Sequence, residues 1–182
     1  ESHFDHGESA GTGEVHGAGG PSVKHPVVFY GESPKGSFFA VRGRGTWLHS
    51  DILFEAVAGI LDEGRAVTID LGDCTYLDST FLGTIHELVE RSRSGRGTLK
   101  VQRITPPVRE LFDELSMTRV LAAVSEDATF LPPDMQPLAP VLDPSGSQWR
   151  VLRAHEALAA LSAKNREKFL AVVDTIRSDL GR

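Results

Sequence analysis

Three adjacent residues, Asp78, Ser79 and Thr80, place an acid and two hydroxyls where a strand-like apolar run gives way to a helical pattern. Each of these side chains can accept a hydrogen bond at a helix N-terminus, so capping alone would account for them. A phosphate of roughly −1.5 to −2 charges on Ser79 would be attracted by the N–H groups of the helix start. Asp78 would repel it. The triplet therefore predicts either a structural cap or a phosphorylation switch on a docking surface.

The same turn also supplies the residue types of a hydrolase triad, Ser79, Asp78 and His86. Ser79 and His86 stand seven residues apart on the expected helix. At about 1.5 Å per residue this is a rise of about 10 Å, too far for a hydrogen bond. The Gly-x-Ser-x-Gly turn of α/β hydrolases is absent, because Leu77 and Phe81 occupy its glycine positions. We expect no enzyme activity and no catalytic residue.

Metal and redox chemistry have weak support in the sequence. Asp70 and Asp73 flank the end of a strand-like run, but two carboxylates without a third ligand do not predict a cation site. Cys74 is the single cysteine, so neither a disulfide framework nor a zinc-binding thiol set is expected. This cysteine usage is typical of a reducing cytoplasm. We expect no metal and no cofactor.

Composition limits the remaining classes of function. The 182 residues suit one domain plus extensions, and 40% hydrophobic residues suffice for a core. The net charge of −6 argues against nucleic acid as the main partner. No apolar run approaches the roughly 18 residues of a membrane span. The N-terminal residues lack the apolar centre of a signal peptide. We expect a cytoplasmic protein without direct membrane insertion.

Apolar periodicity predicts strands that alternate with helices. The expected strands span residues 25–30, 37–42, 66–71, 98–104 and 120–124. The expected helices begin at the cap candidates Ser50 and Asp51, at the Asp78 turn, and at Thr105 before two prolines. A β-β-α-β-α-β-α-β order implies right-handed crossovers. The expected fold class is α/β, with a mixed, mostly parallel sheet and helices mainly on one face.

The two ends of the chain differ from this pattern. Residues 1–24 are rich in glycine and histidine, and we expect a flexible tail rather than a metal site at His3, His6 and His16. Residues 129–148 predict a proline-rich linker, and 149–182 predict a helical extension. Its apolar stripe, with Phe169, Val173 and Ile176, must be buried. Packing in cis over the open sheet face is expected, with a homodimer or partner contact as the alternative.

The strand–turn–helix from Val67 to Gly83, V-T-I-D-L-G-D-C-T-Y-L-D-S-T-F-L-G, resembles the signature of STAS domains, the family of bacterial anti-sigma factor antagonists. The following T-L-K-V-Q-R-I-T-P-P-V-R-E-L-F-D-E-L-S-M, residues 98–117, is similar to the family's next strand and its Ser/Thr-Pro-x-Val helix. The resemblance covers residues 27–124, within an expected STAS domain at 25–128. It implies a sheet with helices on one side and no catalysis.

The resemblance also implies a mode of action. Family members with this serine are phosphorylated there by a partner serine kinase, an anti-sigma factor with a histidine-kinase-like ATPase fold. In the unphosphorylated form they bind that kinase and release the sigma factor. Ser79 matches the phospho-acceptor, with Thr80 as the second hydroxyl, Asp78 the preceding acid, and Leu82 the start of the Leu-Gly pair.

Two residues depart from the family pattern. Phe81 stands where the family usually has glycine, and Thr46 where many members have an aspartate near the kinase interface. The expected partner-binding residues are Asp78, Ser79, Thr80, Phe81, Leu82 and Thr46. The alternative function is a non-switching STAS scaffold. It would bind the ABC-type ATPase of a lipid transporter or belong to a stress-signalling assembly.

Overall fold

The computed structural model describes residues 25–181, so the predicted tail at 1–24 and its three histidines lie outside the described residues. The strands are β1 (Val28–Ser33), β2 (Gly36–Gly45), β3 (Ala66–Leu77), β4 (Thr98–Gln102), β5 (Val124–Ser125) and β6 (Gln136–Pro137). The helices are α1 (Trp47–Asp62), α2 (Ser79–Ser94), α3 (Pro106–Glu114), α4 (Thr118–Ala122), α5 (Pro144–Ala159) and α6 (Ala163–Leu180).

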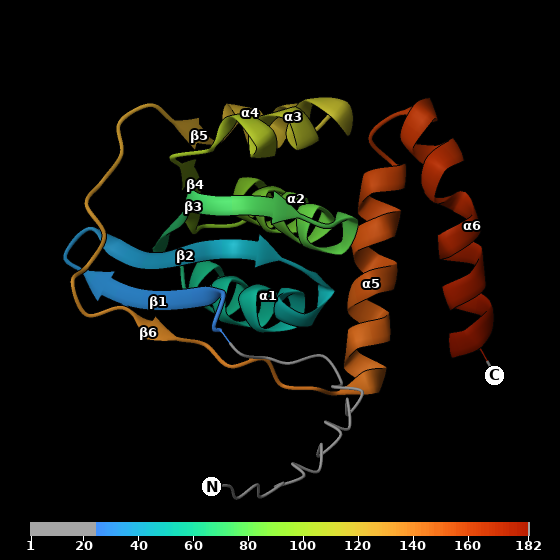
Figure 1. Ribbon diagram of the computed structural model, residues 1–182, viewed down its shortest axis with the longest axis horizontal. Coiled ribbons are helices and arrows are strands. Elements are labelled where there is room, and N and C mark those ends of the chain that lie inside the picture. Colours follow the sequence, from blue (N-terminus) through green and yellow to red (C-terminus); the bar gives the residue numbers. More distant parts are fainter. Residues whose placement is uncertain (1–24, 182) are drawn as a thin grey trace, which may run out of the picture.

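The described strands form one sheet in the order β5-β4-β3-β2-β1-β6. The β2–β3, β3–β4 and β4–β5 pairs are parallel, whereas β1 pairs antiparallel with both β2 and β6. The two antiparallel pairs lie at one end of an otherwise parallel sheet (Figure 1). This arrangement confirms the predicted α/β fold with a mixed, mostly parallel sheet and a C-terminal helical extension.

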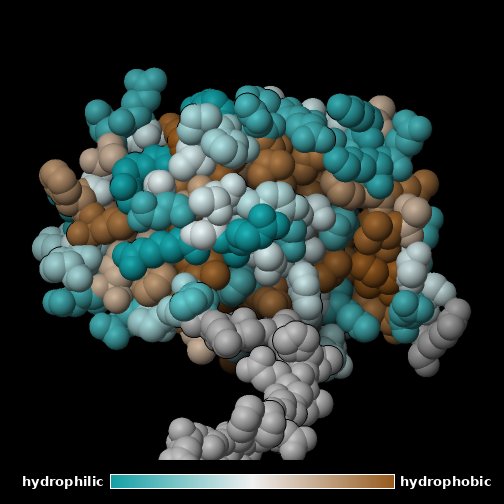
Figure 2. Space-filling model, viewed as in Figure 1, coloured by the Kyte–Doolittle hydropathy of each residue, from teal (hydrophilic) through white to brown (hydrophobic). Residues whose placement is uncertain are grey.

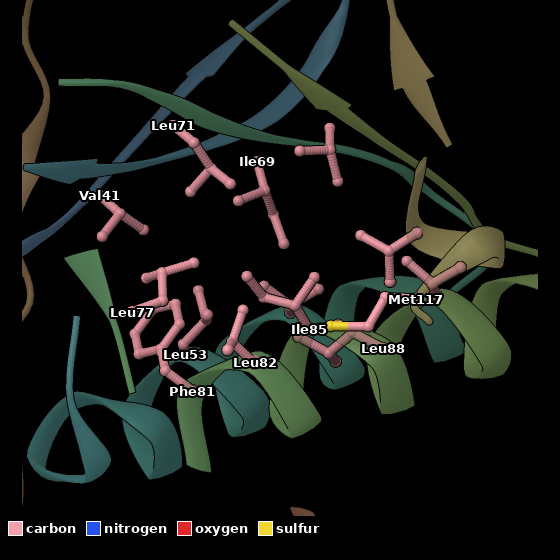
Figure 3. Packing of buried hydrophobic residues seen from close by; sticks show 14 of the residues in the cluster. Val41, Leu53, Ile69, Leu71, Leu77, Phe81, Leu82, Ile85, Leu88 and Met117 are labelled. Atoms are coloured by element: carbon pink, nitrogen blue, oxygen red, sulfur yellow. The ribbon is translucent and has the colours of Figure 1, made fainter. Parts of the chain in front are cut away.

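The core lies between the sheet and the helices on one of its faces (Figure 3). Ile69 and Leu71 of β3 point from the sheet toward Leu53 of α1 and Ile85 of α2, and all four are fully buried. Successive strand residues face opposite sides, so this alternation in β3 fixes which face receives the helices. The central strand of the sheet is therefore the one that leads directly into the Asp78 turn.

Several element boundaries differ from those predicted. Helix α1 begins at Trp47 with Thr46 as N-cap, so the predicted cap at Ser50 or Asp51 is wrong. The Ser50 hydroxyl instead donates to the Thr46 carbonyl inside the first turn (3.2 Å). Strand β3 continues to Leu77, six residues beyond its predicted end. Most of the predicted last strand, up to Ala122, is helix α4.

The open face of the sheet is crossed by a segment that we call the strap, residues 126–135, which joins the two edge strands β5 and β6 (Figure 1). Thr129 exchanges two hydrogen bonds of 2.9 Å with the Gln102 side chain, and its hydroxyl accepts one from Lys100. Lys100 and Gln102 flank the core residue Val101 on β4, so they face away from the helices.

The last helix packs in cis, as predicted, but its expected position over the open face is wrong. Helix α6 packs against α5, and α5 packs against α1 and α2 at the end of the domain (Figure 1). Phe169 and Val173 are buried in this layer, and Ile176 is partly exposed. The domain limits at 25–128, 129–148 and 149–182 stay predictions, although α5 begins at Pro144, inside the predicted linker. Within residues 25–181, no helix has the length and apolar character of a membrane span.

Candidate functional site

The candidate site is built on Asp78, which connects the starts of two helices. One carboxylate oxygen of Asp78 accepts from the backbone N–H of Phe81 in α2 (2.9 Å), and the other accepts from Trp47 N–H in α1 (2.8 Å). The backbone N–H of Asp78 donates to the Gly45 carbonyl at the end of β2 (3.0 Å). A single side chain thus satisfies donors from two helix starts that would otherwise lack a partner. The capping interpretation of Asp78 is confirmed.

Ser79 is the first residue of α2, and its hydroxyl contacts a residue 76 positions further along the chain. Its Oγ lies 2.9 Å from Nε2 of His155 in α5. Nδ1 of His155 lies 2.7 Å from the Val151 carbonyl, which can only accept, so Nδ1 carries a proton, and in the neutral imidazole Nε2 then accepts from the serine. Ser79 is partly buried and His155 is buried. The candidate phospho-acceptor is therefore held by the C-terminal extension.

The next three residues of the turn are buried. Thr80 is 4% exposed, Phe81 0% and Leu82 2%. Phe81 points into the core beside Leu77 (Figure 3), so its assignment to a docking surface is corrected: its side chain belongs to the core. This bulky ring fits because Gly45 lies opposite, where an added methyl group would come within 3.0 Å of the ring.

Thr46 lies next to Asp78 but does not reach Ser79 through any described hydrogen bond. As N-cap of α1 it receives the His49 backbone N–H on its carbonyl (2.9 Å), and its own N–H donates to Nδ1 of His49 (3.3 Å). Burial lowers the pKa of His49, and Asp78 opposes this effect. The structure thus brings Thr46, Asp78 and Ser79 to the same end of the domain, with Thr46 in a structural role.

The outer face of α2 is in close contact with α5 over two further turns. A methyl group on Gly83 would lie 2.3 Å from the carbonyl oxygen of Ala154, so the two helices approach here as closely as a glycine permits. One turn further, Glu87 accepts from Arg150 (2.6 Å), whose guanidinium also lies 4.0 Å from the Phe54 ring centre. Burial raises the pKa of Glu87 although Arg150 opposes this shift.

A small cavity of about 270 Å³ opens beside Ser79. Its walls are mainly apolar and include Leu82 and Phe169. The polar lining residues include Lys168, whose Nζ donates to Oε1 of Glu114 at 3.3 Å. The cavity lies between the Asp78 turn, the end of α3 and helix α6. The cavity leaves space next to the Ser79 hydroxyl, which contacts His155 of α5.

The hydrolase triad considered from the sequence does not assemble. Nδ1 of His86 is buried without a hydrogen-bond partner among the described residues, and burial lowers the pKa of this imidazole. The histidine that does reach Ser79 is His155, and its other nitrogen is oriented by a backbone carbonyl rather than by a carboxylate. Sequence reasoning missed His155, because neither spacing nor a local motif connects it with Ser79.

Asp70, considered as a cation ligand, belongs to a hydrogen-bond network on the open face. Its carboxylate accepts from Arg103 twice (2.7 Å each), from Gln102 (2.7 Å) and from the Gly72 N–H (3.0 Å). Burial opposes ionisation of this side chain, but these hydrogen bonds together lower the pKa of Asp70. The aspartate thus links β3 to the residues after β4.

Comparison with known proteins gives a family. A family model described as "Mlab, STAS domain" matches residues 28–123. No curated protein matches. Solved structures similar to this chain include SpoIIAA, the Bacillus cell fate determinant, in the phosphorylated form (11% identity, TM-score 0.47, 57% of this chain and 92% of that one).

A second is the anti-sigma factor antagonist SpoIIAA in its unphosphorylated form, with 10% identity, a TM-score of 0.43, and 48% of this chain and 82% of that one covered. A third is the crystal structure of Mglu, at 18% identity and a TM-score of 0.36, over 40% of this chain and 18% of that one. At TM-scores below 0.5 these likenesses add nothing to the family match. Because the matched residues 28–123 make up more than half of the chain, the protein belongs to the STAS domain family.

Proposed function

We propose that this protein is a protein-binding regulatory domain, an anti-sigma factor antagonist in a phosphorylation-controlled partner switch with Ser79 as acceptor. The observation that carries the proposal is the difference between the two hydroxyls of the turn. Ser79 is partly exposed on a small cavity at the start of a 16-residue helix, whereas Thr80 is 4% exposed. A kinase would therefore reach Ser79 before Thr80.

A phosphate on Ser79 would change the site in two ways. It would add roughly −1.5 to −2 charges beside the Asp78 carboxylate, which like-charge repulsion opposes. It would also replace the hydroxyl that donates to His155, so the contact between α2 and α5 would have to rearrange. Both effects act on the surface around the start of α2, without requiring a new fold in the sheet.

The partner supported by this proposal is a serine-kinase anti-sigma factor with a histidine-kinase-like ATPase fold. It would bind the unphosphorylated protein in the cytoplasm, with no nucleic acid and no cofactor involved. The proposed role needs no catalytic residue in this chain. The capping role of Asp78 and the backbone-oriented His155 fit a binding surface better than a hydrolytic centre.

Incubation with candidate kinases of this class and ATP, followed by intact-mass measurement, tests the proposal. One phosphoryl group is expected on the wild-type protein and none on Ser79→Ala. Ser178→Ala serves as a matched control, because Ser178 is an exposed helical serine in α6. Phosphate retained on Ser79→Ala, or no phosphate with any kinase that binds the protein, would overturn the switch.

The alternative is a non-switching scaffold that docks on an ABC-type ATPase or in a stress-signalling assembly. The observation that favours it is that Ser79 already donates to His155, while Gly83 packs on the backbone of Ala154. A pull-down from the native cytoplasm separates the two functions. The switch predicts capture of a histidine-kinase-like ATPase that Ser79→Asp abolishes. The scaffold predicts an ABC-type ATPase that Ser79→Asp still captures.

A further inference from the structure

We propose that α5 and α6, residues 144–180, form a displaceable cover over the Ser79 face of α2, so that this face is a helix-docking surface occupied in cis. This proposal rests on the proposed function only to explain why the cover would be displaced. The physical claim that the cover opens stands independently. Figure 1 shows α5 lying against the ends of α1 and α2, with α6 outside it.

The contacts of α2 with the cover recur at successive turns of one face. Ser79, Gly83 and Glu87 are spaced by four residues, so they share a stripe on α2. Opposite them, α5 offers an imidazole acceptor (His155), a backbone carbonyl (Ala154) and a guanidinium (Arg150). The stripe thus contains a hydrogen-bond donor (Ser79), a residue without a side chain (Gly83) and an anion (Glu87), and α5 presents a complementary group to each.

The outer helix holds the cover at a second point. The Asn165 side-chain amide donates to the Leu115 carbonyl at the end of α3 (2.8 Å) and to the Leu158 carbonyl of α5 (3.0 Å). Phe169 packs edge-on against His155, with ring centres 5.4 Å apart, and lines the cavity beside Ser79. Displacing α5 therefore requires α6 to leave with it.

The contact surface is incompletely satisfied, which favours a reversible contact. Among residues 25–181, Nε of Arg150 and Nδ1 of His86 are buried without a hydrogen-bond partner. Arg150 belongs to the contact, and His86 lines a hollow with Ala157 of α5. Nε of Arg150, which belongs to the contact, loses its hydration when the cover closes and regains it when the cover opens. The Glu87–Arg150 pair, with Arg150 buried and Glu87 partly buried, has the same property, because desolvation offsets part of its attraction.

The connection to the sheet also permits displacement. Residues 138–143, between β6 and α5, form neither helix nor strand, and Val141 and Leu142 are 72% and 65% exposed. Figure 2 shows further hydrophobic surface over the α5–α6 layer, where Leu170 is 50% exposed. Few contacts would have to break in this tether when the helix pair moves.

The cover also indicates the chemistry of the partner. A protein that takes the place of α5 must present a helix with a hydrogen-bond acceptor opposite Ser79, a closely approaching backbone opposite Gly83 and a cation opposite Glu87. Gly83 allows the backbone of such a helix to approach closely, because a side chain at position 83 would collide with that backbone, as it would with Ala154 in the present contact. The Ser79 face thus selects a basic helix whose backbone can approach α2 closely at Gly83.

The test measures access to position 79 in the full chain, by thiol labelling of the variant Ser79→Cys with a maleimide. In the folded chain Cys74 does not interfere, because it is fully buried and burial raises the pKa of its thiol to about 11. In denaturant both thiols react, so peptide mapping assigns the label to position 74 or 79. Gly83→Ala is then added to open the cover, since its methyl group would collide with Ala154. Gly59→Ala is the matched control: Gly59 lies in α1, and nothing lies within 4 Å of its added methyl group.

We expect slow labelling of Ser79→Cys compared with the same chain in denaturant, and an increase of about tenfold or more with Gly83→Ala. Gly59→Ala should leave the rate unchanged. Hydrogen exchange should rise in α5 and α6 but not in β3. Ala154→Leu adds bulk to a fully buried residue of α5 at the same contact, so it should reproduce the increase without altering the sheet.

Equal labelling rates in Gly83→Ala and Gly59→Ala, with Ala154→Leu also unchanged, would overturn the cover. Labelling of Ser79→Cys at the denatured rate would do the same. Neither outcome depends on a kinase or a sigma factor. A cover that opens without any phosphorylation or partner capture would leave this inference standing and remove the proposed function.

Discussion

The two faces of α2 are built from different contacts. Toward the sheet, Phe81, Ile85 and Leu88 are fully buried in a continuous apolar core (Figure 3). Toward α5, Ser79, Gly83 and Glu87 meet an imidazole, a backbone carbonyl and a guanidinium, beside Leu158 and Phe169 as the apolar part of the contact. Apolar burial is lost whenever such a contact opens, whereas polar groups regain water. The difference indicates that α2 is anchored permanently on one side and reversibly on the other.

Phe81→Ala tests the permanent side and should have the largest effect. The ring is 0% exposed and packs against Leu77 and Gly45, so its removal leaves a cavity under the start of α2. We expect a loss of about 3–5 kcal/mol in the free energy of unfolding, measured by urea denaturation. A loss below about 1 kcal/mol would show that the turn collapses around the cavity and that the core does not depend on this ring.

Asp78→Ala tests the turn before α2, where the core face and the α5 face of this helix both begin. It removes the acceptor for the N–H groups of Trp47 and Phe81, which begin α1 and α2. We expect a loss of about 2–3 kcal/mol in the free energy of unfolding, and a smaller loss for Asp78→Asn, which keeps one acceptor oxygen. If both variants unfold at the wild-type denaturant concentration, the carboxylate serves a partner rather than the fold.

The permanent side is also the part that sequence patterns could predict. The alternation of Ile69 and Leu71, and the spacing of Ile85 and Leu88, are local patterns that specify a strand and a helix face. The acid–hydroxyl pair at Asp78 and Ser79 marked the turn between them. The role of Thr46 as N-cap of α1 was not predicted, because Ser50 and Asp51, four and five positions later, are equally good cap residues.

The reversible side could not be predicted, because its contacts join distant segments. His155 and Arg150 look like ordinary polar residues of an amphipathic helix, and nothing local connects them with Ser79 or Glu87. The strap was not predictable for the same reason. Residues 129–135 have the composition of a linker, yet Thr129 forms three hydrogen bonds with side chains of β4. Periodicity finds which face of a helix is buried, but not what buries it.

Asp70 allows a test of the sheet's other face through pH. Its folded pKa is lowered, so its contribution to stability is present above the ordinary carboxyl pKa of about 3.9 and is lost as pH falls through the folded value. We expect Asp70→Asn to lose about 1–2 kcal/mol at pH 7. The difference from wild type should vanish toward the acid end of a urea-denaturation series. A difference that is constant with pH would mean that packing, not charge, sets the role of Asp70.

Ser79→Ala should have the smallest effect, and the most localised. It removes one hydrogen bond and leaves Nε2 of His155 without a donor, which costs about 0.5–1.5 kcal/mol in the contact between α2 and α5. Because the core face of α2 is untouched, hydrogen exchange should rise in α5 and α6 while β3 and the midpoint of global unfolding stay near wild type. A uniform rise across the whole domain would mean that the two faces of α2 open together. In that case a partner could reach Ser79 only by unfolding the domain, and the contrast between a permanent and a reversible face would fail.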